Sequence, residues 1–139
     1  MLKLSIVLLV KIHHMRILKR HVKPFLEKNV DLIIFCGGDG TARDVFEIVA
    51  KRIPLLGIPS GVKMHSGVFG INTRAVAKML HEFVNRRLTI GDAEIMDLDE
   101  DRYRKGEWNI QLFGIAKGIV EQRMFRLEKP VMNQCLMMK

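Results

Sequence analysis

The spacing of apolar and polar positions along the chain predicts short strands separated by amphipathic helices. The apolar run at 32–35 and the run at 55–58 are short and bounded by charged residues, glycine or proline, as is typical of buried strands. The apolar run at 2–10 is either a further strand or an irregular leader. Between these runs, apolar residues recur at helical spacing, and we expect helices that cover a sheet near residues 13–28, 42–52 and 73–87.

Particular residues predict where two of these helices bend or begin. Pro24 is expected to kink or divide the first helix near Lys23, because proline lacks the N–H that a helix interior needs. Asn72 or Thr73 is expected to cap the third helix. The inward face of that helix should consist of Val76, Met79, Leu80, Phe83 and Val84.

The order of these elements predicts an α/β fold, with a short parallel sheet flanked by helices. A strand, a helix and a strand within 31–58 imply two parallel strands joined by a right-handed crossover. From Leu88 the helical spacing gives way to extended stretches, and we expect an antiparallel extension near 90–118. The length of 139 residues suits one ordinary domain with a sizeable core.

The first buried strand ends in a glycine-rich turn, Gly37-Gly38-Asp39-Gly40-Thr41, just before a helical pattern. Glycines let a ligand approach the backbone closely, and the free N–H groups of a helix start favour an anion. Thr41 and Asp44 also fit a capping pattern for this helix. A carboxylate at this position would repel a bound phosphate unless the carboxylate has a role in the chemistry. Asp39 would hold a magnesium ion, orient a donor or take a proton from an attacking hydroxyl.

A second glycine-rich segment, GIPSGVKMHSGVF, occupies residues 57–69 after the next strand. The carboxyl ends of parallel strands share one edge of a sheet, so both segments should face one crevice. In this segment Gly61 can relax the backbone, Lys63 can neutralise phosphate and Ser66 can donate to an oxygen. From the residues alone, a solvent-facing loop lysine is the preferred interpretation of Lys63, and His65 has no partner in the sequence that would make it a ligand or a base.

Together the two segments resemble the N-terminal domain of the ATP-NAD kinase-like, or AcoX-like, family within the NAD kinase and diacylglycerol kinase superfamily. The Gly-Gly-Asp-Gly-Thr block is similar to that of NAD kinases, of diacylglycerol and sphingosine kinases and, with serine last, of phosphofructokinases. The second block distinguishes among them, because it resembles the Gly-x-Pro-x-Gly-x-Lys-x-x-Ser-Gly-Val-Phe stretch of the ATP-NAD kinase-like family. The Pro-x-Gly-Thr-x-Asn-Asp segment of lipid kinases is absent.

The resemblance implies transfer of a phosphoryl group from ATP to a hydroxyl acceptor such as NAD, with Mg²⁺ accompanying the nucleotide. Asp39 would be the catalytic general base or a metal-linked orienting group. The resemblance also implies an α/β nucleotide-binding domain at 1–90 and the start of a β-rich second domain at 91–139. The alternative is a non-catalytic nucleotide-binding or interaction domain that retains the fold. The phosphate-binding residues implied are Gly37, Gly38, Gly40 and Thr41 on one side, and Gly61, Lys63 and Ser66 on the other.

Two departures from the family pattern predict that this chain alone is a poor enzyme. Members usually carry an Asn-Pro and glycine-rich loop after their first strand, and residues 1–30 contain none. Only residues 94–118 resemble the second domain, which helps enclose the acceptor. We therefore expect weak nucleotide binding and no substantial turnover. The strand near 107–116 should also have an unpaired edge that favours formation of a homo-oligomer.

Composition and charge narrow the remaining function classes. The net charge of +8 raises nucleic acid as a partner. However, the stretch between Lys11 and Lys28 contains a single aromatic residue, Phe25, rather than aromatic residues interleaved with the basic ones. A solvated helix face is therefore preferred, and an anionic substrate comes second. The two cysteines, Cys36 and Cys135, lack metal-site spacing and favour a reducing cytoplasm. No apolar run is long enough to cross a membrane, and the acidic run at 97–101 is read as a solvated turn.

Overall fold

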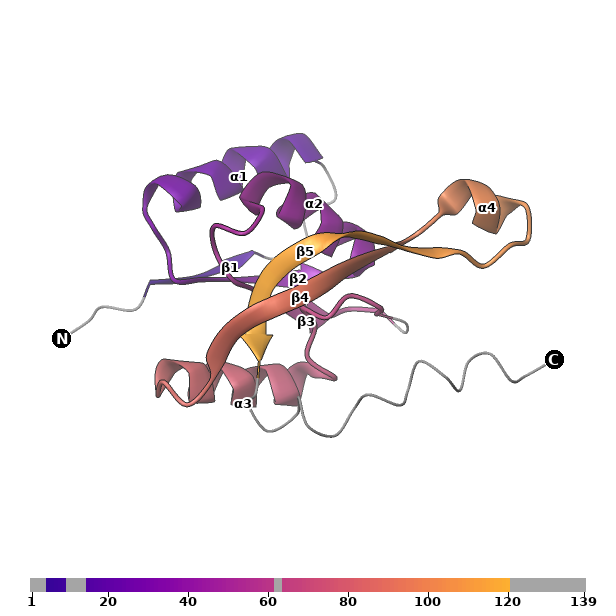
Figure 1. The fold of residues 1–139 in the computed structure, drawn as a ribbon. Coiled ribbons are helices and arrows are strands. Elements are labelled where there is room, and N and C mark those ends of the chain that lie inside the picture. The colour runs from indigo at the N-terminus through magenta and orange to yellow at the C-terminus, as the bar shows by residue number, and fades with distance from the viewer. Residues whose placement is uncertain (1–4, 10–14, 62–63, 121–139) are drawn as a thin grey trace.

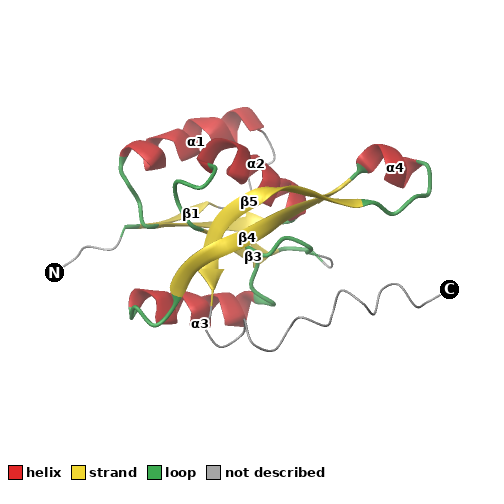
Figure 2. Ribbon diagram, viewed as in Figure 1, coloured by secondary structure: helices red, strands yellow, loops and turns green. Residues whose placement is uncertain are grey.

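The computed structural model describes residues 5–9, 15–61 and 64–120, which form one mixed sheet flanked by helices (Figures 1 and 2). The strand order is β1-β2-β3-β5-β4, with β1, β2 and β3 parallel and β4 antiparallel to β5. The predicted α/β class is therefore confirmed. The predicted parallel pairing of the strands near 32–35 and 55–58 is confirmed too. The elements are β1 (Ile6–Leu9), α1 (Met15–Glu27), β2 (Leu32–Gly37), α2 (Asp39–Val49), β3 (Leu55–Pro59), α3 (Thr73–Val84), β4 (Thr89–Leu98), α4 (Glu100–Arg104) and β5 (Ile110–Val120).

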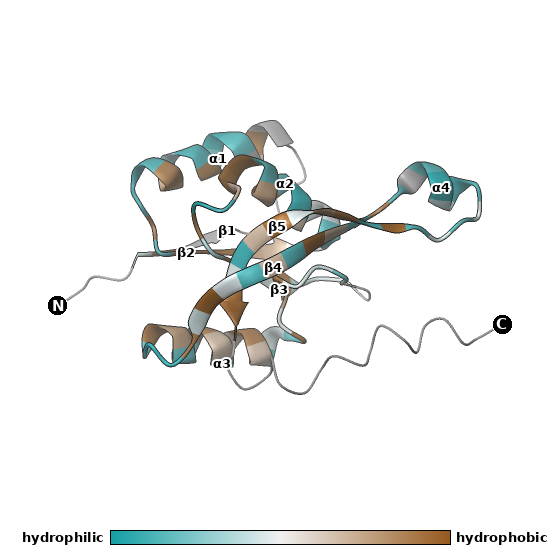
Figure 3. Cartoon of the chain, in the orientation of Figure 1, coloured by the Kyte–Doolittle hydropathy of each residue, from teal (hydrophilic) through white to brown (hydrophobic). Residues whose placement is uncertain are grey.

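Successive apolar residues of β2 supply two separate cores. Because side chains alternate across a strand, Ile33 and Phe35 enter the core beneath α1 and α2, whereas Leu32 and Ile34 enter the core against α3. Figure 1 shows α1 and α2 on one face of the sheet and α3 on the other, and Figure 3 shows apolar residues along β2 and on the inward sides of the helices. Burial of both faces explains why the run is continuously apolar.

The antiparallel extension is a long, curved hairpin. β4 pairs with β5 from Thr89↔Val120 to Leu98↔Ile110, with an irregularity between Ile95 and Met96. Along its other side β5 meets β3 at one pair, Leu55↔Gly118. The far end of the hairpin carries α4 and projects away from the helices (Figure 1).

Pro24 does not divide α1, so that part of the prediction is wrong. The helix continues through Pro24 to Glu27. Pro24 lies on the exposed face, where water can replace the hydrogen bond that proline cannot make. The next two residues, Phe25 and Leu26, pack against the core and hold the last turn in place. The chain then leaves the helix at Asn29, which has a φ of 47°.

The start of α2 also differs from the prediction. The helix begins at Asp39 with Gly38 as its N-cap and no side-chain cap bond, so the capping pattern of Thr41 and Asp44 is not used. The reason lies in the turn, because the Asp39 side chain binds a different segment and Thr41 packs over Gly37. At α3 the prediction of Asn72 as cap is confirmed, since its Oδ1 accepts from the N–H of Ala75 at 2.8 Å.

The expected inward position of Val84 is wrong. Val84 ends α3 and is 50% exposed, because the helical period places it at the edge of the inward face rather than on it. The remaining inward residues of α3 do pack on the sheet as expected; they are Val76, Met79, Leu80 and Phe83.

Candidate functional site

The two glycine-rich segments lie side by side at the carboxyl ends of β2 and β3. Gly37 is paired with Pro59 in the parallel ladder, and the N–H of Ser60 donates to the carbonyl of Gly37 at 3.1 Å. The first segment leads into α2 and the second continues to Phe69, which forms an isolated bridge back to Gly57. The expectation that both segments share one edge of the sheet is thus confirmed.

Asp39 joins the two segments. Its Oδ1 accepts the N–H of Ser66 at 2.8 Å, and its Oδ2 accepts the N–H of His65 at 2.9 Å. The ring Nδ1 of His65 lies 3.1 Å from the same Oδ2. The Asp39 side chain is only 12% exposed. The first residue of α2 therefore holds the second loop in position through backbone and side-chain hydrogen bonds.

These hydrogen bonds set the charge state of Asp39. Burial, the largest single influence, raises the pKa of Asp39, but hydrogen bonding by Ser66 and His65 outweighs burial. The net result is a pKa below the usual value for an aspartate, because the donors stabilise the ionised form. Asp39 is consequently a stable anion near neutral pH and a weak proton acceptor.

Ser66 connects the second loop to the hairpin. Its side chain is buried, its Oγ donates to the carbonyl of Met96 at 3.1 Å, and it accepts the N–H of Met96 at 3.0 Å. The next residue, Gly67, donates its N–H to the carbonyl of Glu94 at 2.7 Å. The structure therefore places the Ser66 hydroxyl on the backbone of β4, and Ser66 positions the loop.

The glycines of the first segment differ in their surroundings. A Cβ built on Gly37 would lie 2.4 Å from Oγ1 and 2.5 Å from Cβ of Thr41, so Gly37 is needed where β2 meets α2. A Cβ on Gly40 would meet no atom within 4 Å. Gly40 is exposed and faces open space at the first turn of α2, where an anion could approach the backbone.

Met64 occupies the space between the two segments. A Cβ on Gly38 would lie 3.8 Å from its Sδ and Cε, and a Cβ on Gly61 would lie 2.9 Å from its Cε. Met64 thus lies against both proposed phosphate-binding segments. Lys63, which the sequence placed in the same group, lies outside the described residues.

The residues at this edge do not form a magnesium site of their own. Both oxygens of Asp39 already accept N–H groups, and no cluster of three His, Cys, Asp or Glu residues occurs within 5–9, 15–61 and 64–120. Magnesium prefers oxygen ligands and commonly binds through substrate phosphates and water.

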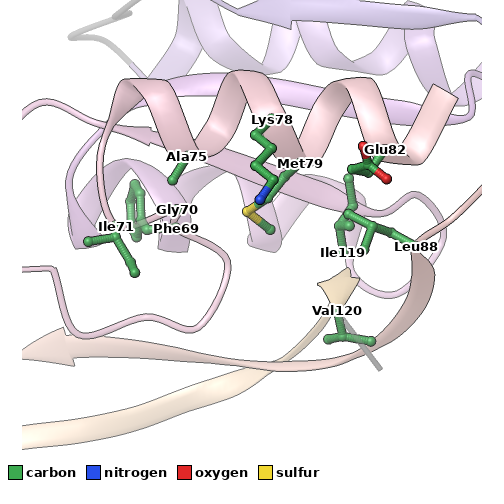
Figure 4. A pocket seen from close by; sticks show the side chains of 10 residues that line it. All are labelled: Phe69, Gly70, Ile71, Ala75, Lys78, Met79, Glu82, Leu88, Ile119 and Val120. Atoms are coloured by element: carbon green, nitrogen blue, oxygen red, sulfur yellow. The ribbon is translucent and has the colours of Figure 1, made fainter. Parts of the chain in front are cut away.

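Two cavities lie next to the second segment. One, of about 340 Å³, lies at the loop itself and is lined by Pro59, Gly61, Met64, Ser66, Phe69, Gly70 and Ile71. The other, of about 360 Å³, lies between α3 and the end of β5 and is mostly apolar, with Lys78 and Glu82 as its charged residues (Figure 4). They share Phe69, Gly70 and Ile71, so the loop after Ser66 forms a wall of both.

Sequence reasoning missed two side chains near this edge. His65 has a partner after all, namely Asp39, 26 residues earlier in the chain. Arg43 of α2 forms an ion pair with Asp97 of β4, and its guanidinium carbon lies 5.9 Å from the ring centroid of Phe113. No local spacing signals such contacts.

The acidic run and the cysteines have ordinary structural positions. Asp99 caps α4 by accepting the N–H groups of Asp101 and Arg102, each at 3.1 Å. Cys36 is half-buried near the end of β2, and Cys135 lies outside the described residues. Among the helices that the structure describes, none combines the length and apolar character needed to span a membrane.

Comparison with known proteins gives one family. A family model described as the ATP-NAD kinase N-terminal domain matches residues 8–88, which is more than half of the chain. That match contains β2, α2, β3 and α3 and therefore both glycine-rich segments. A comparison with curated proteins finds no match.

Proposed function

Because the chain belongs to the ATP-NAD kinase family, we propose that it binds ATP and transfers a phosphoryl group to a hydroxyl acceptor such as NAD. Membership supports a nucleotide-binding, kinase-like function, and the family uses ATP, generally with a divalent metal ion. The single observation that carries the proposal is the hydrogen-bonded junction of the two segments at Asp39. It creates an anion-binding helix start beside a second glycine-rich loop, as phosphoryl transfer requires.

The proposed phosphate site lies at the first turn of α2. Gly38, Gly40 and Thr41 surround the nucleotide phosphates there, and Gly37 permits the close packing on which the turn depends. On the opposite side Gly61 closes the site, and Lys63, which lies outside the described residues, is the phosphate-neutralising residue that the resemblance implies. Ser66 contributes by fixing the loop to β4.

Asp39 is proposed as the residue that organises this site. Of the two roles implied by the resemblance, its hydrogen bonds and its lowered pKa favour orientation over proton abstraction. The fixed carboxylate keeps the second loop against the start of α2. Phosphoryl transfer depends chiefly on such positioning, together with electrostatic stabilisation of the phosphoryl group.

The test combines binding and turnover measurements. We expect ATP with Mg²⁺ to bind weakly in calorimetric titration and NADP to form only slowly in the presence of NAD, because few residues resemble the second domain that helps enclose the acceptor. The D39N variant keeps the shape of the side chain but not its charge, and its turnover should fall. D101N is the matched control, because Asp101 is exposed on α4. Unchanged turnover in D39N would contradict the proposed role of Asp39.

A non-catalytic nucleotide-binding domain is the second candidate, favoured by the engagement of both Asp39 oxygens with the protein's own donors. It predicts ATP binding without any phosphorylated product. Binding of nucleic acid is a distant third candidate and predicts strong, steeply salt-dependent binding of a DNA duplex. Titration with ATP, NAD and a duplex at several salt concentrations separates the third candidate from the first two, and a search for phosphorylated product separates the first from the second.

We also propose a homo-oligomer, a domain division and a location. Among the residues that the structure describes, the side of β5 away from β4 is bonded to β3 only at Gly118. The rest of that edge supports pairing with a second copy of the chain. The family match ends at 88 and β4 begins at Thr89, which supports a boundary near residue 90. Cysteine usage supports the cytoplasm as the location.

A further inference from the structure

His65 is the titratable group at this site whose ring is open to solvent. Its side chain is 33% exposed, whereas that of Asp39 is 12% exposed. Two hydrogen bonds to the same Asp39 oxygen, one from the backbone N–H and one at the ring Nδ1, fix its position. The ring is therefore both held in place and accessible to a substrate.

The partner determines which ring nitrogen carries the proton. An ionised carboxylate can only accept hydrogen bonds, so Nδ1 of His65 must be the donor in its contact with Oδ2 of Asp39. In the neutral ring, Nε2 then has no proton and is available as an acceptor. Asp39 is the charged group that contacts the ring among those the structure describes.

The alternative proton acceptor, Asp39 itself, is poorly placed. Its two oxygens accept the N–H groups of Ser66 and His65 as well as the His65 ring. A protonated Asp39 oxygen would become a donor and could no longer accept its present hydrogen bond, so the second loop would be held less firmly. The His65 ring lies on the second loop, which is held against the start of α2, the proposed position of the phosphates.

We propose that His65 accepts the proton of the hydroxyl that attacks the phosphoryl group, and that Asp39 is its positioning residue. This inference rests on the proposed function and deepens it. The acceptor oxygen forms a bond to the γ-phosphorus, and the bond from that phosphorus to the bridging β-phosphate oxygen breaks. ADP leaves, and the hydroxyl proton moves to Nε2 of His65.

The first experiment needs no turnover. In the full chain labelled with ¹⁵N, ring nitrogen shifts at neutral pH should show His65 with the proton on Nδ1 and none on Nε2. In D39N this preference should weaken, because an amide can present either a donor or an acceptor. A proton on Nε2 of the neutral wild-type ring, or a tautomer unaffected by D39N, would overturn the pairing.

The second experiment measures turnover. H65N places an amide N–H where Nδ1 lay, so the bond to Asp39 can persist while the acceptor is lost. We expect kcat to fall about 10²- to 10⁴-fold with little change in KM for ATP. H81N is the matched control, because His81 is an exposed histidine on α3. Added imidazole should partly restore the activity of H65A.

Each outcome decides a different point. Wild-type turnover in H65N, or H65A that imidazole does not restore, would overturn the role of His65 while leaving the kinase proposal intact. If the wild-type chain forms no product from ATP and any acceptor tested, the proposed function fails and the proton-accepting role fails with it. The ring tautomer would then still report whether Asp39 orients His65.

Discussion

Substitution of Gly37 by alanine should destabilise the fold, whereas the same change at Gly40 should not. A Cβ at position 37 would lie 2.4, 2.5 and 2.8 Å from three side-chain atoms of Thr41. One of these is the Thr41 Cβ, which sits on the backbone of α2 and cannot rotate away. Relief therefore requires β2 and α2 to move apart.

The expected sizes follow from these surroundings. Overpacking of a tight interior site costs about 1–3 kcal/mol, so G37A should lower the free energy of unfolding by about that amount. At position 40 the added methyl group meets no atom within 4 Å and lies in the first turn of a helix. There alanine should raise the free energy of unfolding by about 0.5–1 kcal/mol.

Urea unfolding followed by circular dichroism gives both values, and ATP titration of the two variants adds a functional reading. G40A should be stably folded but bind ATP more weakly, because the methyl group enters the space proposed for the phosphates. G37A as stable as the wild type would show that the contact with Thr41 is easily relieved. ATP binding unaffected by G40A would remove Gly40 from the phosphate site.

Three further predictions test other parts of the structure. The pKa of Asp39 is lowered in the folded protein, so ionised Asp39 stabilises the fold above the unfolded pKa, and this contribution is lost as the pH falls through the folded pKa. D39N should therefore lose less stability in acid than the wild type does. Urea midpoints measured over a range of pH check this. Arg52 donates to two carbonyls at the end of α2, at 3.2 and 2.6 Å; R52A should lower the free energy of unfolding by about 1 kcal/mol, and R74A, on the exposed start of α3, by a few tenths at most. Leu112 on β5 is 56% exposed. L112K should shift a dimer toward monomer in light scattering, whereas the control V84K on α3 should not. A wild-type chain that is monomeric at all concentrations tested would contradict the proposed oligomer.

Much of the fold could be read from local spacing. The continuous apolar run Leu32–Phe35 predicts a strand buried on both faces, and the two cores on either side of β2 confirm it. The apolar spacing of α2 places Val45, Ile48 and Val49 inward, where they are buried. Such features depend on the two-residue and 3.6-residue periods of strands and helices, which are properties of neighbouring residues.

The start of α2 shows where local signals failed. Thr41 and Asp44 have the types and spacing of a cap, yet the helix begins at Asp39. Packing of Thr41 over Gly37 and the hydrogen bonds of Asp39 to the second loop decide the boundary. A cap bond contributes about 1 kcal/mol, so several tertiary contacts at the same turn readily override it.

The sequence by itself determined that an aspartate lies among glycines between a buried strand and a helix, and that a second glycine-rich loop shares the same edge of the sheet. Only the tertiary structure decided which groups Asp39 binds and which nearby hydroxyls and rings are left to contact a substrate. The Ser66 hydroxyl is hydrogen-bonded to the backbone of β4, and the His65 ring is paired with Asp39, which lies far from it in sequence. The physical reason is that these contacts span 26 to 30 residues, and their geometry depends on how the crossover and the hairpin pack against one sheet.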